Sequence, residues 1–161
     1  MERQMSENDF IVSKTDLRGK ITYCNRIFIE MAEYMEDELL GAPHNIIRHP
    51  NMPKAVFKLL WDKIQKKEEV FAFVLNQTKN KNEYWVFANV TASLDVKGNV
   101  IGYYSVRRKP NAKALDIIKP LYAQMLKAEE NSNTSASTKI LTDLLQEKGV
   151  DYNELIISIQ E

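Results

Sequence analysis

The sequence predicts an α+β fold in which a five-stranded antiparallel sheet carries helices on one face, followed by a helical C-terminal tail. Two observations lead to this prediction. Runs rich in β-branched and aromatic residues, bounded by turn residues, come as a pair near the N-terminus and as a group between residues 70 and 106. Between them, residues 28–67 hold apolar side chains at helical spacing. Strands and helices segregated in this way favour one antiparallel sheet with helices packed against it.

The strands follow from the apolar runs and the turns between them. They are expected at residues 11–13, 21–25, 70–75, 84–94 and 100–106. Asp16 and Gly19 supply the chemistry of the first turn, and Lys97-Gly98-Asn99 is a hairpin signal for the last. The unbroken apolar run Val70–Leu75 suits a strand that is covered on both faces.

The helices are expected in the middle of the domain, at residues 28–34, 36–40 and 54–67. The last of these has the clearest pattern, because its apolar residues form one stripe and its charged residues fall elsewhere. The stripe consists of Val56, Leu59, Leu60 and Ile64, with Trp61 on its flank. Gly41 is a suitable end for the helix before it, since glycine commonly follows a helix C-terminus.

Composition excludes several classes of protein. The 161 residues carry 22 basic and 22 acidic side chains, which argues against general nucleic-acid binding and electrostatic membrane attachment. With one cysteine no internal disulfide can form, which favours a reducing compartment. No apolar run approaches the roughly 20 residues of a membrane helix, and residues 1–9 lack the apolar core of a signal peptide. We therefore expect a cytoplasmic protein without direct membrane insertion.

The chain divides into a leader at 1–9, a domain at 10–110 and a helical C-terminal extension at 111–161. The leader is expected to be mobile or helical. In the extension, the pattern predicts a helix over 111–130 that kinks or breaks near Lys119, a flexible linker at 131–137, and short helices at 138–146 and 151–160. Such short helices are marginal alone, so we expect them to cover the exposed face of the sheet or to dock on a partner.

The segment Gly41–Pro53 has the most unusual composition of the chain. It holds both histidines and three of the five prolines, so a long regular helix is excluded. An amide, a guanidinium and two imidazoles stand between the prolines, and all of them can donate hydrogen bonds. A broken backbone that presents polar groups beside an apolar sheet suits the wall of a ligand pocket, although an ordinary loop explains the same composition.

Over about residues 10–110 the order of elements resembles a PAS domain. The segment from Asp16 to Asn25 looks like the opening hairpin of that family. Gly41–Pro53 resembles the signature of aerotaxis-receptor PAS domains, which bind FAD. Leu60-Trp61, Val74–Asn76 and Tyr84–Thr91 match the same subfamily. The resemblance implies a flavin between the helical face and the sheet.

The resemblance also implies which residues contact the cofactor. They are Asn76, Trp61, Arg48, His49, His44 and Asn45. Asn76 matches the flavin-contacting asparagine of the family and has both a donor and an acceptor for the pyrimidine edge of the ring. Trp61 matches a tryptophan near the flavin in related redox sensors, and Arg48 is suited to a phosphate or a ring oxygen. Each has a simpler explanation: core packing for Trp61, loop hydrogen bonds for the histidines, and a strand-end turn for Asn76.

Light-sensing flavin domains of this fold use a cysteine in the helical wall, whereas Cys24 lies in the second strand. The sequence therefore predicts a redox sensor. No metal-ligand spacing and no catalytic constellation is found, so we do not expect an enzyme. Two alternatives remain. One is a PAS gas sensor with heme b and His44 or His49 as axial ligand. The other is a ligand-free interaction module whose pocket is filled by Trp61, Phe71 and Phe73.

The resemblance extends to the partner. The chain looks like the separate PAS subunit of a split energy-taxis receptor, whose partner is a membrane-bound chemotaxis transducer. The implied role is cytoplasmic sensing of redox state through FAD, with any recruitment to the inner membrane provided by that partner. A homodimer is compatible with this interpretation, and no nucleic-acid partner is expected.

Overall fold

The computed structural model describes residues 1–131 and 134–161. Within these residues, six strands form one sheet. The strands are β1 (Glu2–Arg3), β2 (Ile11–Thr15), β3 (Ile21–Cys24), β4 (Val70–Gln77), β5 (Glu83–Leu94) and β6 (Val100–Arg108). The helices are α1 (Arg26–Ala32), α2 (Glu36–Leu39), the 3₁₀ helix η1 (His44–Ile47), α3 (Lys54–Gln65), α4 (Ala112–Asn131), α5 (Thr134–Lys148) and α6 (Tyr152–Gln160).

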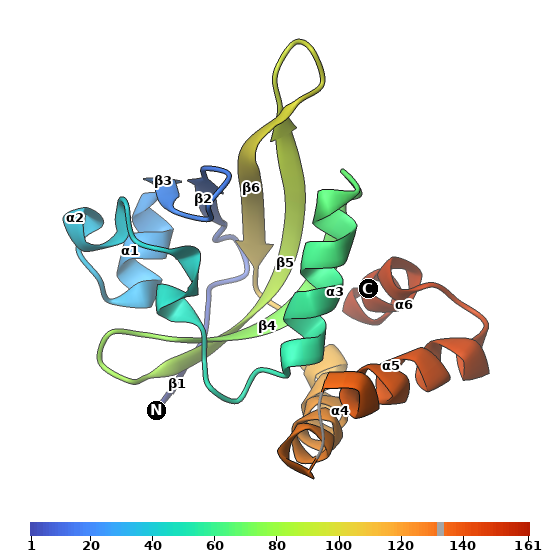
Figure 1. Ribbon diagram of the computed structural model, residues 1–161. Helices are drawn as coiled ribbons and strands as arrows, with labels where there is room; N and C mark the ends of the chain where they lie inside the picture. The colour runs from blue at the N-terminus through green and yellow to red at the C-terminus, as the bar shows by residue number, and fades with distance from the viewer. Residues whose placement is uncertain (132–133) are drawn as a thin grey trace.

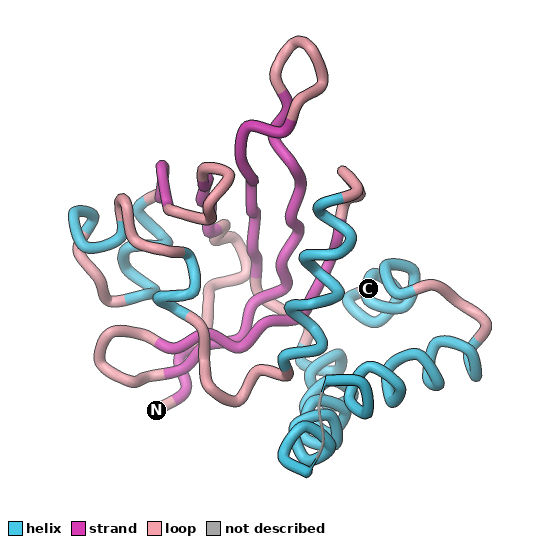
Figure 2. Tube along the Cα trace, in the orientation of Figure 1, coloured by secondary structure: helices cyan, strands magenta, loops and turns pink. Residues whose placement is uncertain are grey.

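The five expected strands pair antiparallel in the spatial order β4, β5, β6, β2, β3 (Figure 1). β2 and β6, which are far apart in sequence, lie side by side at the centre, with Ser13 opposite Ser105. The predicted α+β fold with a helical C-terminal segment is confirmed. Figure 2 shows the β5–β6 hairpin projecting beyond the helices that flank the sheet.

The N-terminal residues are part of the sheet, in contrast to the expected mobile or helical leader. Glu2 and Arg3 form β1 and pair parallel with the start of β5, at Glu83 and Tyr84. Met5 is buried in the core beneath α1. A strand this short gives almost no signal in the sequence, because its pairing partner lies some eighty residues further along the chain.

The helices cover both faces of the sheet. α1, α2, η1 and α3 cover one face, which we call the inner face. The other, outer face is covered over β4 and β5 by α4, α5 and α6 (Figure 1). Strand parity separates the two faces, because successive side chains of a strand point to opposite sides. On β5, Val86 and Ala88 point inward while Trp85 and Phe87 point outward.

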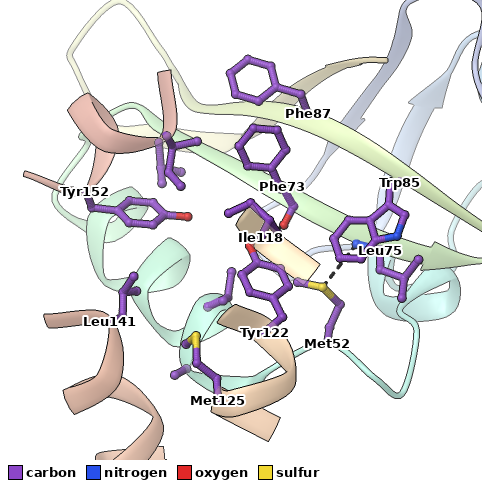
Figure 3. Close-up of a cluster of buried hydrophobic side chains, with 14 of the residues drawn as sticks. Met52, Phe73, Leu75, Trp85, Phe87, Ile118, Tyr122, Met125, Leu141 and Tyr152 are labelled. Carbon is purple, nitrogen blue, oxygen red and sulfur yellow. Dashed lines mark hydrogen bonds between the residues drawn. The ribbon is translucent and has the colours of Figure 1, made fainter. Parts of the chain in front are cut away.

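The outer-face core is dense and aromatic (Figure 3). Phe73 and Phe87 pack with ring centroids 5.2 Å apart, and Trp85 lies 5.9 Å from Tyr122 of α4. Each C-terminal helix adds a side chain to this cluster: Ile118 from α4, Leu141 from α5 and Tyr152 from α6. The expectation that the tail covers the exposed sheet face is therefore met in the described residues.

Two details of the tail differ from expectation. α4 runs from Ala112 to Asn131 without a break, although Pro120 lies inside it. α5 begins at Thr134, so residues 134–137 of the expected linker are helical and Ser137 is buried. Residues 132 and 133 of that linker lie outside the described part of the chain. Tertiary burial of the apolar stripe outweighs the turn-forming composition of this segment.

Candidate functional site

A cavity of about 390 Å³ lies between the inner face of the sheet and the helical wall. Its volume falls in the range of small-molecule pockets. The wall contributes residues of η1, the following loop and α3, namely Pro43, His44, Asn45, Ile47, Arg48, Phe57, Leu60, Trp61 and Ile64. The sheet contributes Ser13, Thr15, Val74, Asn76, Ala88, Val90, Tyr103, Ser105 and Arg107. Small inward side chains on β4 and β5 leave the space that the cavity occupies.

The proline-rich loop is held against the opening hairpin by its backbone. The N–H of Gly41 donates to Ile21 O at 2.8 Å, and the N–H of His44 donates to Gly19 O at 2.9 Å. Gly41 has φ 84°, a left-handed conformation that glycine adopts without strain. These contacts fix the start of η1, so that its first residue points toward β2 and β6.

At that wall, His44, Ser13 and Arg107 form a hydrogen-bonded cluster. The Ser13 hydroxyl lies 3.0 Å from His44 Nε2, and Arg107 Nη1 lies 3.1 Å from the same nitrogen. Arg107 Nη2 donates to Ser13 Oγ at 2.6 Å. A guanidinium can only donate, so His44 Nε2 is an acceptor and the proton of the neutral ring is on Nδ1.

The electrostatics of the cluster are unusual. Burial, followed by the positive charge of Arg107, lowers the pKa of His44 to about 3. Burial lowers the pKa of Arg107 to about 10, so the guanidinium remains charged at neutral pH. Among residues 1–131 and 134–161, no carboxylate forms an ion pair with Arg107. The cavity therefore has a buried positive charge on one wall.

Asn76 adds a polar side chain from β4 to the lining. It is buried near the end of β4, and its parity points the amide into the cavity. Its backbone also forms an isolated antiparallel bridge with Arg48. The residue thus joins the sheet to the loop of the helical wall, which places two of the predicted site residues side by side.

Arg48, Trp61 and Asn45 lie where the cavity opens. The Arg48 guanidinium stacks on the ring of Phe57, 3.8 Å from its centroid. Trp61 is 46% exposed and packs edge-on against Tyr103, with ring centroids 5.6 Å apart. The core-packing explanation for Trp61 is therefore wrong. Asn45 is exposed and lines the same opening.

His49 is the predicted site residue that the structure does not bring to the cavity. Its Nδ1 accepts from the N–H of Asn51 at 2.9 Å, and its Nε2 lies 2.9 Å from Glu83 Oε2. The side chain is buried and ties the loop to the start of β5. This geometry matches the alternative that a histidine here holds the loop together, and it is a correction to the expectation of cofactor contact.

Both histidines use ring nitrogens in these contacts, which leaves the heme alternative without support. In the described part of the chain, no group of three or more His, Cys, Asp or Glu side chains is arranged to bind a metal ion. Cys24 is buried beneath α1 and α2 rather than in the cavity, and burial raises the pKa of its thiol. Phe71 and Phe73 pack in the outer-face core, so they do not fill the pocket as the ligand-free alternative supposed.

Ser13 and Arg107 line the cavity but were not among the predicted site residues. The last strand was expected to end at residue 106, whereas β6 extends to Arg108. Tyr103, Ser105 and Arg107 share one parity of β6 and all line the cavity. The spacing of two residues between Ser105 and Arg107 indicated that their side chains share one face of the strand. The sequence did not show which face of the strand lies against the helices.

None of the helices in the described residues has the length and apolar content needed to cross a membrane.

Comparison with known proteins agrees with this geometry. Over 118 residues, or 73% of the chain, the protein is 36% identical to the Aerotaxis receptor of Escherichia coli (strain K12). Over 97 residues, or 60% of the chain, it is 24% identical to the Nitrogen fixation regulatory protein of Klebsiella pneumoniae. The chain spans 23% and 20% of the lengths of these relatives.

Solved structures of light-oxygen-voltage domains share the fold. The dark structure of the blue-light photoreceptor Aureochrome1 LOV superposes with a TM-score of 0.58 and 26% identity, over 75% of this chain and 84% of that one. A light-oxygen-voltage domain studied with a flavin analogue gives a TM-score of 0.56 and 27% identity, over 76% and 86%. A family model described as the PAS fold matches residues 21–107. The chain belongs to the PAS family.

Proposed function

We propose that this protein is a redox sensor that binds FAD in the inner-face cavity. The observation that supports the proposal most strongly is the cavity itself, which combines an apolar slot with a buried amide at Asn76. Leu60, Val74 and Val90 provide apolar walls for a flat ring. The similarity to the Aerotaxis receptor, and to a domain studied with a flavin analogue, makes a flavin the cofactor class to test first.

The residues fit the two ends of FAD. A flavin ring needs donors and acceptors along its pyrimidine edge, and the Asn76 amide has both. At the opening, Arg18 and Arg48 line the cavity and are suited to the phosphates of the dinucleotide. Trp61 and Tyr103 provide aromatic surface beside the ring site. Bound there, the flavin would supply reversible uptake of electrons and protons.

Strand β4 offers a route from the cavity to the C-terminal helices. Next to Asn76, the N–H of Leu75 donates to Met52 Sδ at 3.2 Å (Figure 3). Further along the same edge strand, Phe73 O accepts from the Tyr122 hydroxyl at 2.6 Å, and Phe71 N–H donates to Asn153 Oδ1 at 3.1 Å. A change in the hydrogen bonds of Asn76 would therefore reach contacts made by α4 and α6. Coupling of this kind is typically worth ~1–3 kcal/mol.

In line with the similarity to the Aerotaxis receptor, we propose that the output is protein–protein signalling and not catalysis. The partner would be a membrane-bound chemotaxis transducer, and the sensor itself would be cytoplasmic. A redox trigger fits better than a light trigger, since Cys24 is buried away from the cavity.

The test is the absorption spectrum of the purified protein, before and after dithionite. We expect two flavin bands, in the blue and near-ultraviolet, that bleach on reduction. A Soret band would instead identify heme. A protein that stays colourless after incubation with FAD and desalting would contradict the proposal and favour a ligand-free interaction module.

A further inference from the structure

We propose that Arg107 recognises negative charge on the ligand in the cavity, and that in the flavin-bound protein it favours the electron-rich reduced form and so sets the potential at which the sensor responds. This inference rests on the proposed function. Neither the sequence motifs nor the family resemblance had selected Arg107.

The charged side chain of Arg107 is buried. Arg107 is 3% exposed, and arginine is rarely buried to this degree unless it is paired with an acid. Removing a guanidinium from water costs several kcal/mol unless a charge or strong hydrogen bonds compensate. Arg3, at the edge of the domain, has such a partner in Glu33 at 3.6 Å. For Arg107, none of the described residues provides one.

The hydrogen-bond partners of Arg107 are neutral. Arg107 donates to the Ser13 hydroxyl and to the neutral ring of His44, and its guanidinium lies over the face of Phe28, 4.7 Å from the centroid. Its Nε is buried and has no hydrogen-bond partner in the described part of the chain. The contacts orient the guanidinium but leave its charge uncompensated and one donor unused.

Arg107 has a fixed position on the cavity wall. Arg107 lies near the end of β6, paired with Ile11 on one side and Ala88 on the other, so its backbone has little freedom. Its side chain lines the cavity. A buried, uncompensated and oriented cation in a ligand pocket is a recognition element for an anionic or electron-rich group.

For a flavin, the consequence is a bias between oxidation states. Reduction adds negative charge to the ring, and a fixed positive charge in a poorly solvated site stabilises that charge. Without the guanidinium, the protein should lose preference for the reduced over the oxidised flavin. We expect a loss of at least tenfold, which for a two-electron couple corresponds to a potential about 30 mV more negative.

The experiment compares Arg107→Gln with Arg107→Lys, which keeps the charge, and with Arg108→Gln. Arg108 is the matched control, because it is the next residue on β6, is exposed and lies over Phe87 on the outer face. The midpoint potential of the bound flavin is measured for each variant by spectroelectrochemical titration. We expect Arg107→Gln to shift it negative, Arg107→Lys to remain closer to the wild type, and Arg108→Gln to leave it unchanged.

A second readout uses the ligand-free protein. Since removal of an uncompensated buried charge relieves a cost, the ligand-free Arg107→Gln protein should melt no lower than the wild type, whereas flavin should raise its melting temperature less. An unchanged potential in Arg107→Gln, or a ligand-free variant that is strongly destabilised, would overturn this inference alone. A wild-type protein that takes up no flavin would overturn the proposed function as well.

Discussion

The two faces of the same strands are built for different purposes. Outward from β4 and β5, Phe73, Trp85 and Phe87 meet the C-terminal helices in a filled, largely aromatic core (Figure 3). Inward, Val74 and Ala88 are small and leave a cavity. Because strand parity assigns alternate residues to opposite faces, one sequence can combine a filled side that stabilises and a hollow side that binds. The outer face should therefore control unfolding, and the inner face should control ligand affinity.

The largest expected effect comes from opening the filled side. Phe73→Ala removes a fully buried ring that packs on Phe87, and we expect the free energy of unfolding to fall by about 3–5 kcal/mol. Urea denaturation of the ligand-free protein measures it. Val90→Ala is the inner-face counterpart, and it should cost clearly less because Val90 is only partly buried and borders open space. Equal costs would contradict the distinction between the faces.

The next effect concerns the protonation of His44. Its pKa in the folded protein is about 3, below the value of about 6.5 in the unfolded chain, so between these values the unfolded state binds one more proton. Stability that is present at neutral pH is then lost as the pH falls, by about 1.4 kcal/mol for each pH unit in the middle of this window.

The measurement is the free energy of unfolding at pH 6 and pH 4, for the wild type and for His44→Gln. The wild type should lose about 2 kcal/mol more than the variant, because only His44 differs between the two proteins. If both lose the same amount, His44 is not a buried neutral base.

A smaller loss of stability is expected where the C-terminal helices contact the pocket wall. The carboxylate of Glu129 on α4 accepts from the N–H groups of Lys54 and Ala55, at 2.8 and 3.3 Å, and so caps α3 across a long sequence separation. Pro53 at the N-cap provides no side-chain cap. Glu129→Gln should cost about 1 kcal/mol, and the exposed neighbour Glu130→Gln almost nothing, by chemical denaturation. Equal free energies of unfolding for the two variants would contradict a stabilising cap of α3 by Glu129.

The smallest effect on stability is expected at the opening of the cavity. Trp61 is 46% exposed, so Trp61→Ala should change the free energy of unfolding of the ligand-free protein by roughly 0.5 kcal/mol or less. Affinity for FAD should nevertheless fall, because the aromatic surface beside the ring site is lost. A variant with reduced stability and unchanged affinity would place Trp61 among the core residues instead.

The sequence predicted the elements well where their patterns are long and local. The stripe of α3 and the runs of β4, β5 and β6 have strong periodicity, and the hairpin signals set their order. β1 was missed, because a strand of two residues depends on an edge provided by β5. Residues 134–137 were assigned to a linker by composition, yet they belong to α5, which packs against α3 and α4.

For the site, the sequence indicated the loop and β4 but not which side chains meet. Asn76 and Arg48 were selected, and the structure joins them by a backbone bridge. Arg107 was missed because its place in the cavity depends on the pairing of β2 with β6. The expected cofactor contact of His49 was wrong because its side chain binds Glu83, which is distant in sequence. Local pattern does not report such contacts.

The most direct test of the account is a titration of FAD into ligand-free protein, followed by flavin fluorescence, for two neighbours on β4. Asn76 faces the cavity, whereas Gln77 has the opposite parity and does not line it. We predict that Asn76→Ala weakens FAD binding at least tenfold and that Gln77→Ala binds FAD with the same affinity as the wild type. Equal affinities for the two variants would contradict the claim that the inner face of the sheet binds the flavin.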